Sequence, residues 1–385
     1  MGTLTTRELL HATVSLVRAA LDGEGELPKA ELLPAIAALA TRHDILPLVA
    51  VGLRHLDASF DDAVMKPFRD AELVAVLRYQ RLAYAYRQLS ELLEGGEIPH
   101  IPLKGTVIRD CYPEPWYRTS CDVDVLVKEM DLSRTVALLT KNGYKQGLQG
   151  PHDIAFDSPN GIHIEIHFCL TNTVYEQDSV YDGVFETATT AENKTYERRL
   201  SSDVFYYHFI KHMALHFVYG GAAIRNYLDL YMMKTQLSLS ATRYAETLER
   251  GGLLRFAEAS ENLAFSWFQG ADRDGSAEMI EAYLLECGMY NRAKKRIAVE
   301  QTRSGKLGRM VSRIFLPYYS LSMKYPSLKR APFLYPFYQV RRWCGLIFCG
   351  GVRRSIKEIS NNMLVSREEV DAARQLFERL GLEVR

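Results

Sequence analysis

Apolar residues in the first 96 positions of the chain recur at the three- and four-residue spacing of helices. This spacing predicts four helices, over about residues 6–22, 29–43, 45–56 and 67–93. Thr5 and Glu8 form the pattern of a capping box that opens the first helix. Gly95 and Gly96 end the fourth. We therefore predict an N-terminal helical region over residues 1–96.

The periodicity changes between residues 97 and 200, where short apolar runs replace the helical pattern. Four strands are predicted, over residues 98–103, 123–127, 154–156 and 162–168. One short helix begins near Thr106, and another follows Asp131 and ends at Asn142-Gly143. The expected fold class is therefore α+β, with a mixed-sheet α/β core over residues 97–200.

Helical patterning returns at about residue 201, which predicts a C-terminal helical region over residues 201–385. Within it, residues 301–357 contain twelve basic residues and no acidic residue, with tyrosine, phenylalanine and tryptophan interleaved. We call residues 301–357 the basic aromatic segment. The formal net charge of the whole chain is zero, so the rest of the chain is acidic and the protein is polarised.

The composition is typical of a folded protein with two or three domains. The chain has 385 residues, of which 47% are hydrophobic and 24% are charged, and its 22 tyrosines argue against disorder. No apolar run approaches the roughly 20 residues that span a bilayer, and the charged N-terminal helix is unlike a secretory signal. The six cysteines show neither disulfide nor zinc spacing. We therefore expect a reduced, cytoplasmic protein.

Two short stretches contain the residues with candidate chemistry. Lys104-Gly105-Thr106 follows the first predicted strand, and Asp122 and Asp124 lie two residues apart on the second. Because side chains alternate along a strand, both carboxylates project from one face. Two such carboxylates repel each other unless a cation lies between them. Mg²⁺ prefers oxygen ligands, and phosphates can complete its coordination shell. The Lys104 ammonium and the N–H groups of Gly105 and Thr106 are the expected phosphate donors.

A third carboxylate lies on the last predicted strand. Its residues His163, Glu165 and His167 alternate with isoleucines, so the acid and the two imidazoles share one face. Two-metal phosphoryl transfer uses about three carboxylates around ions about 4 Å apart. We therefore expect Asp122 and Asp124 to hold the ions at a triphosphate, and Glu165 to assist the ion that activates the incoming hydroxyl.

The order of these motifs resembles that of bacterial nucleotidyltransferase-like proteins of the DNA polymerase β superfamily. The resemblance begins with LKGTVIRDCYPEPWYRTSCDVDVLV and continues through IHIEIHFCL, HFIKHMALHFVYGGAAIRNYLDLYMM and YPSLKRAPFLYPFYQVRRW. It implies a minimal nucleotidyltransferase core, polymerase β-like, between two helical regions. It also implies a Mg²⁺ cofactor and the transfer of a nucleoside monophosphate from an NTP to a hydroxyl or phosphate acceptor.

The resemblance also implies roles for individual residues. The catalytic metal ligands would be Asp122, Asp124 and Glu165. The nucleotide would be bound by Lys104, Gly105, Thr106, Arg118, Ser120 and His167. The superfamily's serine after the glycine is replaced here by Thr106, and Lys104 precedes the glycine, so the lysine is expected to take over the serine's phosphate contact. For Arg118, an ion pair with Asp110 or Asp122 is the alternative.

Two helical patterns near residues 208–229 have more than one interpretation. His208, His212 and His216 recur every four residues and share one helix face. They fit a polar wall facing the active cleft, plain packing or a zinc site. Arg225 and Asp229 have the spacing of a salt bridge within one helix, and a supporting role near the nucleotide is the alternative.

The basic aromatic segment and the activity of the whole chain also leave alternatives open. The segment fits a solvated surface, a site for RNA or another polyanion, or a membrane-surface contact anchored by Trp343–Phe348. The acceptor is a small molecule, a protein or RNA. The alternative to an enzyme is a catalytically inactive protein of the same fold that binds nucleotide or polyanion as a regulatory module.

Overall fold

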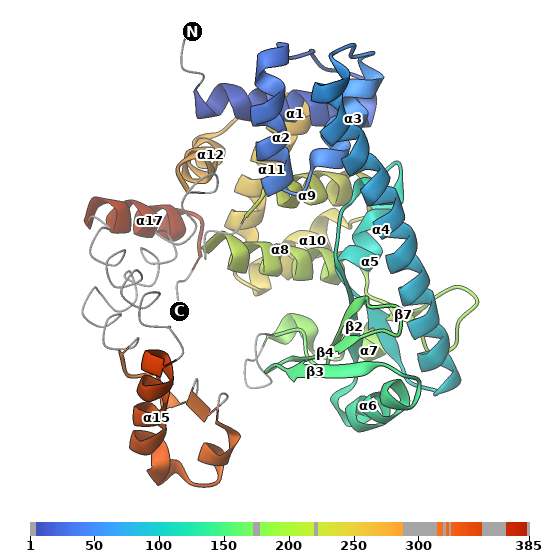
Figure 1. Ribbon diagram of the computed structural model, residues 1–385, viewed down its shortest axis with the longest axis vertical. Helices are drawn as coiled ribbons and strands as arrows, with labels where there is room; N and C mark the ends of the chain where they lie inside the picture. Colours follow the sequence, from blue (N-terminus) through green and yellow to red (C-terminus); the bar gives the residue numbers. More distant parts are fainter. Residues whose placement is uncertain are drawn as a thin grey trace. The chain divides into compact units, whose positions relative to one another are not determined.

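The computed structural model describes most of the chain (Figure 1). The described residues are 5–171, 178–218, 222–287, 314–318, 321–322, 325–348 and 367–382. The chain divides into two compact units, one of residues 1–214 and 222–285 and the other of residues 215–221 and 286–385. Large parts of the basic aromatic segment, including residues 301–313 and 349–357, lie outside the described residues.

The N-terminal region is helical, as the apolar spacing predicts. Its first three helices are α1 (Thr6–Asp22), α2 (Leu33–Arg42) and α3 (Leu46–His55). The capping box at the start of α1 is present, because Thr5 and Glu8 exchange hydrogen bonds. Helices α1 and α3 approach closely at Gly52, where a Cβ would lie 1.9 Å from the Leu16 carbonyl oxygen. A side chain at this position would push the two helices apart.

The fourth helix, α4 (Asp62–Gly95), is 34 residues long and packs along the sheet (Figure 1). It begins five residues before the predicted start at Pro67. Proline is favoured in the first turn of a helix, which is why the sequence pointed to residue 67. The Asp61 side chain instead accepts a hydrogen bond from the Ala63 N–H and caps the helix, and Pro67 lies inside it.

The central sheet has five strands in the order β1-β2-β5-β4-β3. The strands are β1 (His100–Pro102), β2 (Asp122–Val127), β3 (Lys145–Gln149), β4 (Asp153–Asp157) and β5 (His163–His167). Strands β2 and β5 are parallel and the other pairs are antiparallel, so the sheet is mixed. The predicted α+β class with a mixed sheet between helices is confirmed. Strand β3 was not predicted, because all its side chains are exposed and lack the alternation of a half-buried strand.

The two faces of the sheet differ in chemistry. On one face, Val123 and Val125 of β2 and Ile164 of β5 form a buried core with residues of α4 and α6 (Leu132–Lys141). Because strand side chains alternate, the acidic residues of β2 and β5 project from the opposite face. There, Leu126 packs with Phe185 of α7 (Val184–Thr187).

Short elements connect the sheet to the helices that follow it. They are α5 (Gly105–Ile108), η2 (Arg109–Cys111), η3 (Pro115–Tyr117), η4 (Glu129–Asp131), η5 (Ser179–Tyr181), β6 (Thr189–Thr190) and β7 (Arg198–Arg199). The helices after them are α8 (Ser202–Val218), α9 (Ile224–Gln236), α10 (Ala241–Arg250), α11 (Leu254–Gln269) and α12 (Gly275–Cys287). The second unit contains η6 (Pro326–Lys329), η7 (Pro332–Leu334), α15 (Tyr335–Phe348) and α17 (Arg367–Arg379). Among the helices of the described residues, none is both long and apolar enough to span a membrane.

Glu197 joins α4, β1 and β7 through a buried carboxylate. It accepts a hydrogen bond from Ser90 Oγ at 2.7 Å and pairs with Arg199 Nη2 at 2.8 Å. Burial alone would raise its pKa, but hydrogen bonds from His100 and Ser90, together with the Arg199 charge, lower the pKa to about 2. The charged form of Glu197 therefore stabilises the fold.

Glu197→Gln is expected to lower the free energy of unfolding at pH 7 by about 1–3 kcal/mol. The folded-state pKa lies below the ordinary value of 4.5, so the stabilisation is complete above about pH 4.5 and is lost as the pH falls towards 2. Urea unfolding of the wild type should therefore show a steeper loss of stability over that range than unfolding of the variant. Glu249→Gln, at an exposed position on α10, is the matched control. Parallel acid profiles for wild type and Glu197→Gln would contradict this account.

Candidate active site

Adjacent parallel strands bring the candidate carboxylates together. In the register of β2 and β5, Asp124 lies opposite Glu165 and Asp122 opposite His163. Asp124 is buried, whereas Asp122 and Glu165 are partly exposed. Burial and the neighbouring Asp124 charge raise the pKa of Asp122. The acids named from the sequence thus form one cluster at one face of the sheet.

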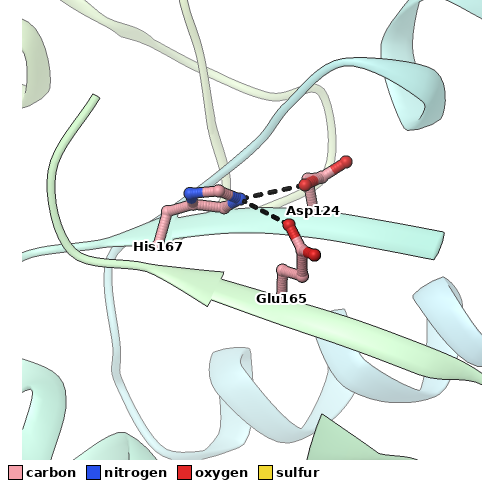
Figure 2. Close-up of side chains that lie close together, drawn as sticks. All are labelled: Asp124, Glu165 and His167. Atoms are coloured by element: carbon pink, nitrogen blue, oxygen red, sulfur yellow. Dashed lines mark hydrogen bonds and ion pairs between the residues drawn. The ribbon is translucent and has the colours of Figure 1, made fainter. Parts of the chain in front are cut away.

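Two cationic donors meet at one oxygen of Asp124. Oδ1 accepts a hydrogen bond from Lys104 Nζ at 2.8 Å and from His167 Nε2 at 2.9 Å (Figure 2 shows the histidine contact). Burial acts to raise the Asp124 pKa, but the hydrogen bond from His167 and the Lys104 charge hold it well below its ordinary value. Burial likewise acts to lower the His167 pKa, and hydrogen bonds to Asp124 and Glu165 raise it instead. Asp124 is therefore a fixed negative charge.

Lys104 acts as the cation of the cluster in this structure. Its Nζ also lies 3.9 Å from Glu165 Oε2, so the ammonium stands between the carboxylates of two strands. The residue occupies a positive-φ conformation, with φ 42° and ψ −120°, which is rare for a residue with a side chain. Such strain persists only where the surroundings impose it, and it is concentrated at functional sites. The turn between β1 and α5 therefore fixes the lysine beside the carboxylates.

Gly105 is needed for close approach rather than for a special backbone angle. A Cβ on this residue would lie 2.7 Å from Arg118 Nη1 and 3.2 Å from Ser120 Cβ. Its carbonyl accepts a hydrogen bond from Arg109 Nε at 2.8 Å, and Arg109 Nη2 donates to Ser120 Oγ at 3.1 Å. Buried Arg109, which the sequence reasoning missed, thus ties the turn to the strand that carries Asp122.

The other residues assigned to the nucleotide have structural partners. The N–H of Thr106 donates to the Leu103 carbonyl at 3.2 Å, and its buried Oγ1 has no hydrogen-bond partner among the described residues. Ser120 accepts from Arg109, and His167 is bonded to Asp124. Their contacts with a nucleotide stay predictions.

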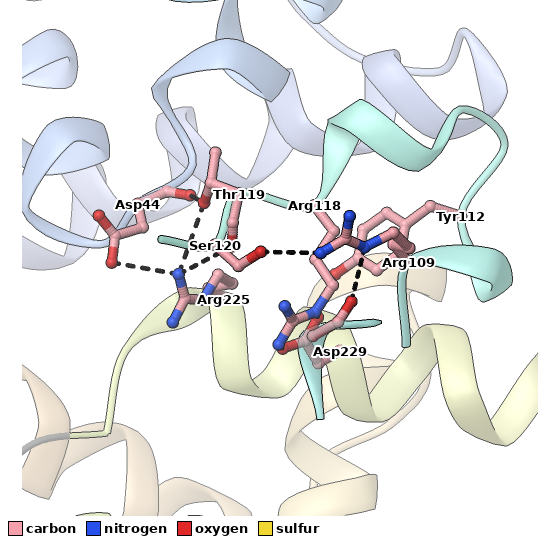
Figure 3. Close-up of polar contacts among 9 residues, drawn as sticks. Asp44, Arg109, Tyr112, Arg118, Thr119, Ser120, Arg225 and Asp229 are labelled. Carbon is pink, nitrogen blue, oxygen red and sulfur yellow. Dashed lines mark hydrogen bonds and ion pairs between the residues drawn. The ribbon is translucent and has the colours of Figure 1, made fainter. Parts of the chain in front are cut away.

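Arg118 forms a buried ion pair with a residue far along the chain (Figure 3). Its Nε and Nη2 donate to the two carboxylate oxygens of Asp229 at 2.9 Å each, and Tyr112 Oη donates to Asp229 Oδ1 at 2.7 Å. The partner is therefore neither Asp110 nor Asp122, and a phosphate contact by Arg118 stays a prediction. The expected pair between Arg225 and Asp229 is wrong.

Arg225 instead reaches the N-terminal helical region. Its Nη1 pairs with Asp44 Oδ2 at 3.3 Å and donates to the Thr119 carbonyl at 3.1 Å (Figure 3). Helix α9 therefore supplies two polar links to the segment between the lysine turn and β2, one through Arg225 and one through Asp229. Helical spacing gave no sign of either link, because each partner lies at least 100 positions away in the sequence.

A cavity of about 830 Å³ lies at the carboxyl ends of β2 and β5, and the three carboxylates of the cluster are not among the residues that line it. Leu126 and Phe168 line it at the strand ends, and Cys169 and Tyr181 line it further out. Charged side chains also line it, namely Lys128 and the acids Glu129, Asp178, Asp182 and Glu186. Because Leu126 lies two residues beyond Asp124 on the same strand, the cavity begins about 7 Å from that residue. It is of the size that small ligands occupy.

His208 contacts the cavity wall and feels the charges of the carboxylate cluster. Tyr181 Oη and His208 Nδ1 are hydrogen-bonded at 3.0 Å, and the buried Nε2 has no partner among the described residues. Burial, followed by the Lys104 and His167 charges, lowers the His208 pKa to about 3. A neutral imidazole therefore lies near the site, and the interpretation of the three histidines as a polar wall stays a prediction. The described residues contain one potential metal-binding group, formed by Asp124, Glu165 and His167, and His208 is not part of it.

The fold and this cluster together define a class of protein. A mixed sheet with carboxylates on adjacent parallel strands, and a lysine-glycine turn beside them, is the arrangement that the nucleotidyltransferase resemblance implies. The chain belongs to the family described as "uncharacterised nucleotidyltransferase", whose sequence model matches residues 31–269. That match covers more than half of the chain, including the sheet and helices α8 to α11. The family name gives nucleotidyl transfer as the general class of reaction.

The remaining comparisons add little. The solution structure of the antibiotic-resistance factor ANT(2″)-Ia matches at 10% identity and a TM-score of 0.28. It covers 50% of this chain and 93% of that chain. So low a TM-score does not establish a shared fold, and the assignment rests on the family match. No curated protein gave a significant match.

Proposed function

We propose that this protein transfers a nucleoside monophosphate from an NTP to a hydroxyl of a small acceptor, with Mg²⁺ as cofactor. The observation that carries the proposal is the cluster of Asp122, Asp124 and Glu165 on two adjacent parallel strands, with the Lys104 ammonium bound among them. The family match supports the general reaction class.

The side chains of the cluster fit a divalent cation. One ligand atom from each of Asp124, Glu165 and His167 lies within 4.8 Å of the others. Carboxylate oxygens are the ligands that Mg²⁺ prefers. His167 already donates to Asp124, which is how a second layer of residues orients a metal-binding carboxylate. Asp124 and Glu165 would therefore hold the ion, and we extend the site to Asp122, which lies outside that group but two residues from Asp124 on the same face of β2. When bound, the ion would neutralise phosphate charge and favour deprotonation of the acceptor hydroxyl.

The protein's own groups have distinct tasks in the proposed reaction. The acceptor oxygen bonds to the α-phosphorus, the bond to the β-phosphate oxygen breaks, and pyrophosphate leaves. We assign receipt of the hydroxyl proton to Glu165, which is partly exposed. Burial acts to lower the Lys104 pKa, but the charges of Asp124 and Glu165 raise it, so the ammonium is charged at neutral pH and can bind the triphosphate.

The direct test uses each of the four NTPs labelled at the α-phosphate, with Mg²⁺ and the small-molecule fraction of a cell extract. Transfer of label to a new compound by the wild type, and its absence after EDTA treatment, would support the proposal. If none of the four NTPs labels any compound, the proposal that the protein catalyses nucleotidyl transfer is rejected. Mg²⁺-dependent NTP binding without transfer would favour the inactive, regulatory alternative.

The cavity at the carboxyl ends of β2 and β5 supports a small acceptor. Four acids and one lysine line it, so its electrostatic potential is unfavourable for RNA or another polyanion. Cys169→Phe, which adds a large side chain at this wall, is expected to lower label transfer by at least about tenfold. NTP affinity should be unchanged, because the cavity lies beyond the carboxylates. Cys169→Ser preserves the volume and is the control. Equal transfer by both variants would show that the acceptor binds elsewhere.

A further inference from the structure

In the second unit, helix α15 packs a polar face against residues 314–318. Tyr335 Oη and Gln339 Nε2 both donate to the Leu316 carbonyl at 2.6 Å. Trp343 Nε1 donates to the Ile314 carbonyl at 2.8 Å, and Arg342 Nη1 donates to the same oxygen at 3.0 Å. Residues spaced by three and four positions share one side of a helix, so these contacts fix which side of α15 packs against residues 314–318.

The opposite side of α15 presents apolar side chains to solvent. Phe337 is 60% exposed and Val340 is 51% exposed, and Phe333, just before the helix, is 80% exposed. Phe337 and Val340 lie three positions apart, and exposed Arg341 flanks them. We call Phe333, Phe337 and Val340 the outer apolar face. Single exposed apolar residues are common, but a helix with its polar side inward and an apolar side outward is characteristic of a docking surface.

The charge around the outer apolar face is positive. The chain contains no acidic residue between Glu300 and Glu358, so every charged side chain of α15 and of the neighbouring η6 and η7 is basic. Arg330 and Arg341 are exposed within this stretch. An apolar helix face bordered by arginines is complementary to a layer of acyl chains beneath anionic headgroups.

Contacts within the unit favour lipid over nucleic acid as the partner. Tyr338 stacks on Tyr325 with ring centroids 4.8 Å apart, and Arg341 lies over the Tyr325 ring. The indole N–H of Trp343 is bonded inside the unit, so Trp343 is not the outward anchor that Trp343–Phe348 suggested in the sequence. The Tyr338 and Trp343 side chains, which could stack bases, are thus engaged internally. The outward set includes an aliphatic valine, which suits acyl chains and does not stack.

We propose that the outer apolar face of α15 binds the surface of membranes that contain anionic lipid. Phe333, Phe337 and Val340 enter the boundary between headgroups and acyl chains, and Arg330 and Arg341 contact lipid phosphates. The proposed association is peripheral, through one face of a helix.

The test is sedimentation of the full chain with vesicles of phosphatidylcholine alone or mixed equally with phosphatidylglycerol. Wild type is expected to bind the mixed vesicles, and binding should weaken with salt. Phe337→Ser combined with Val340→Ser should weaken it by at least about tenfold, because each buried apolar side chain contributes substantially to binding. Arg341→Glu should weaken it as well. Leu73→Ser combined with Leu77→Ser, at exposed apolar positions on α4, is the matched control.

Four outcomes would overturn the proposal. The first is that the wild type does not bind mixed vesicles, and the second is that the α15 and α4 double variants bind them equally. The third is that tRNA binds the protein directly and displaces it from mixed vesicles. The fourth is that the protein is a dimer in solution and that only the α15 variants are monomeric. Circular dichroism checks that the serine variants fold, and Arg341→Glu gives a second result should the double variant fail to fold.

Discussion

Asp124→Asn is expected to lower the rate of nucleotidyl transfer by about a thousandfold. The substitution removes the one buried carboxylate of the cluster, and with it the charge that would hold the divalent cation. Metal ions at such sites supply several kcal/mol of transition-state stabilisation, and each 1.4 kcal/mol corresponds to a factor of ten. Asparagine keeps an oxygen that can accept from Lys104 and His167, so the chain should still fold.

Label transfer from the preferred NTP measures this effect, and Mg²⁺-dependent NTP binding is followed by calorimetry in parallel. Glu91→Gln, an exposed acid on α4, controls for the loss of one negative charge. An Asp124→Asn protein that transfers label at the wild-type rate would rule out Asp124 as a metal ligand.

Asp229→Ala is expected to cost about 3–5 kcal/mol in the free energy of unfolding, because it leaves a buried guanidinium without its counter-charge. Asp229 is 1% exposed and Arg118 is 9% exposed, and the Tyr112 hydroxyl loses its acceptor as well. Urea unfolding monitored by circular dichroism measures the loss.

The double variant Arg118→Leu with Asp229→Leu separates the charge effect from the packing effect. Because neither charge is then stranded, it should be more stable than Asp229→Ala. The NTP affinity of the same double variant tests the predicted phosphate contact of Arg118. If Arg118 has only a structural role, its removal should leave NTP affinity unchanged, whereas loss of a phosphate contact should lower it. If the double variant is the less stable of the two, an unpaired buried charge is not the cause of the Asp229→Ala effect.

The sequence predicted correctly the relative positions of residues that local geometry determines. Asp122 and Asp124 share a face because strand side chains alternate. The position of Glu165 opposite Asp124 follows from the parallel pairing of their strands. The capping box at Thr5 is equally local. For the shared face of Asp122 and Asp124 and for the capping box, a few neighbouring residues contain the whole physical argument, whereas the position of Glu165 also depends on the contact between two strands.

What the sequence did not reveal depends on contacts between distant segments. Asp229 has the right spacing for Arg225, but a buried bidentate pair with Arg118 satisfies the carboxylate better than an exposed helical pair. The positive-φ backbone falls on Lys104, and Gly105 is needed for the close approach of Arg118 and Ser120. Strand β3 has no apolar face at all, so only its pairing with β4 defines it.

In the proposed reaction, the position of the Lys104 ammonium would make nucleotide and cation binding mutually dependent. The ammonium lies against the carboxylate oxygens of Asp124 and Glu165, so it would compete with a divalent ion for them. A triphosphate that attracts the lysine would leave those oxygens available, so each ligand would strengthen the binding of the other by the same factor. Lys104 would thus serve as an internal counter-ion for the acidic pair until substrate arrives.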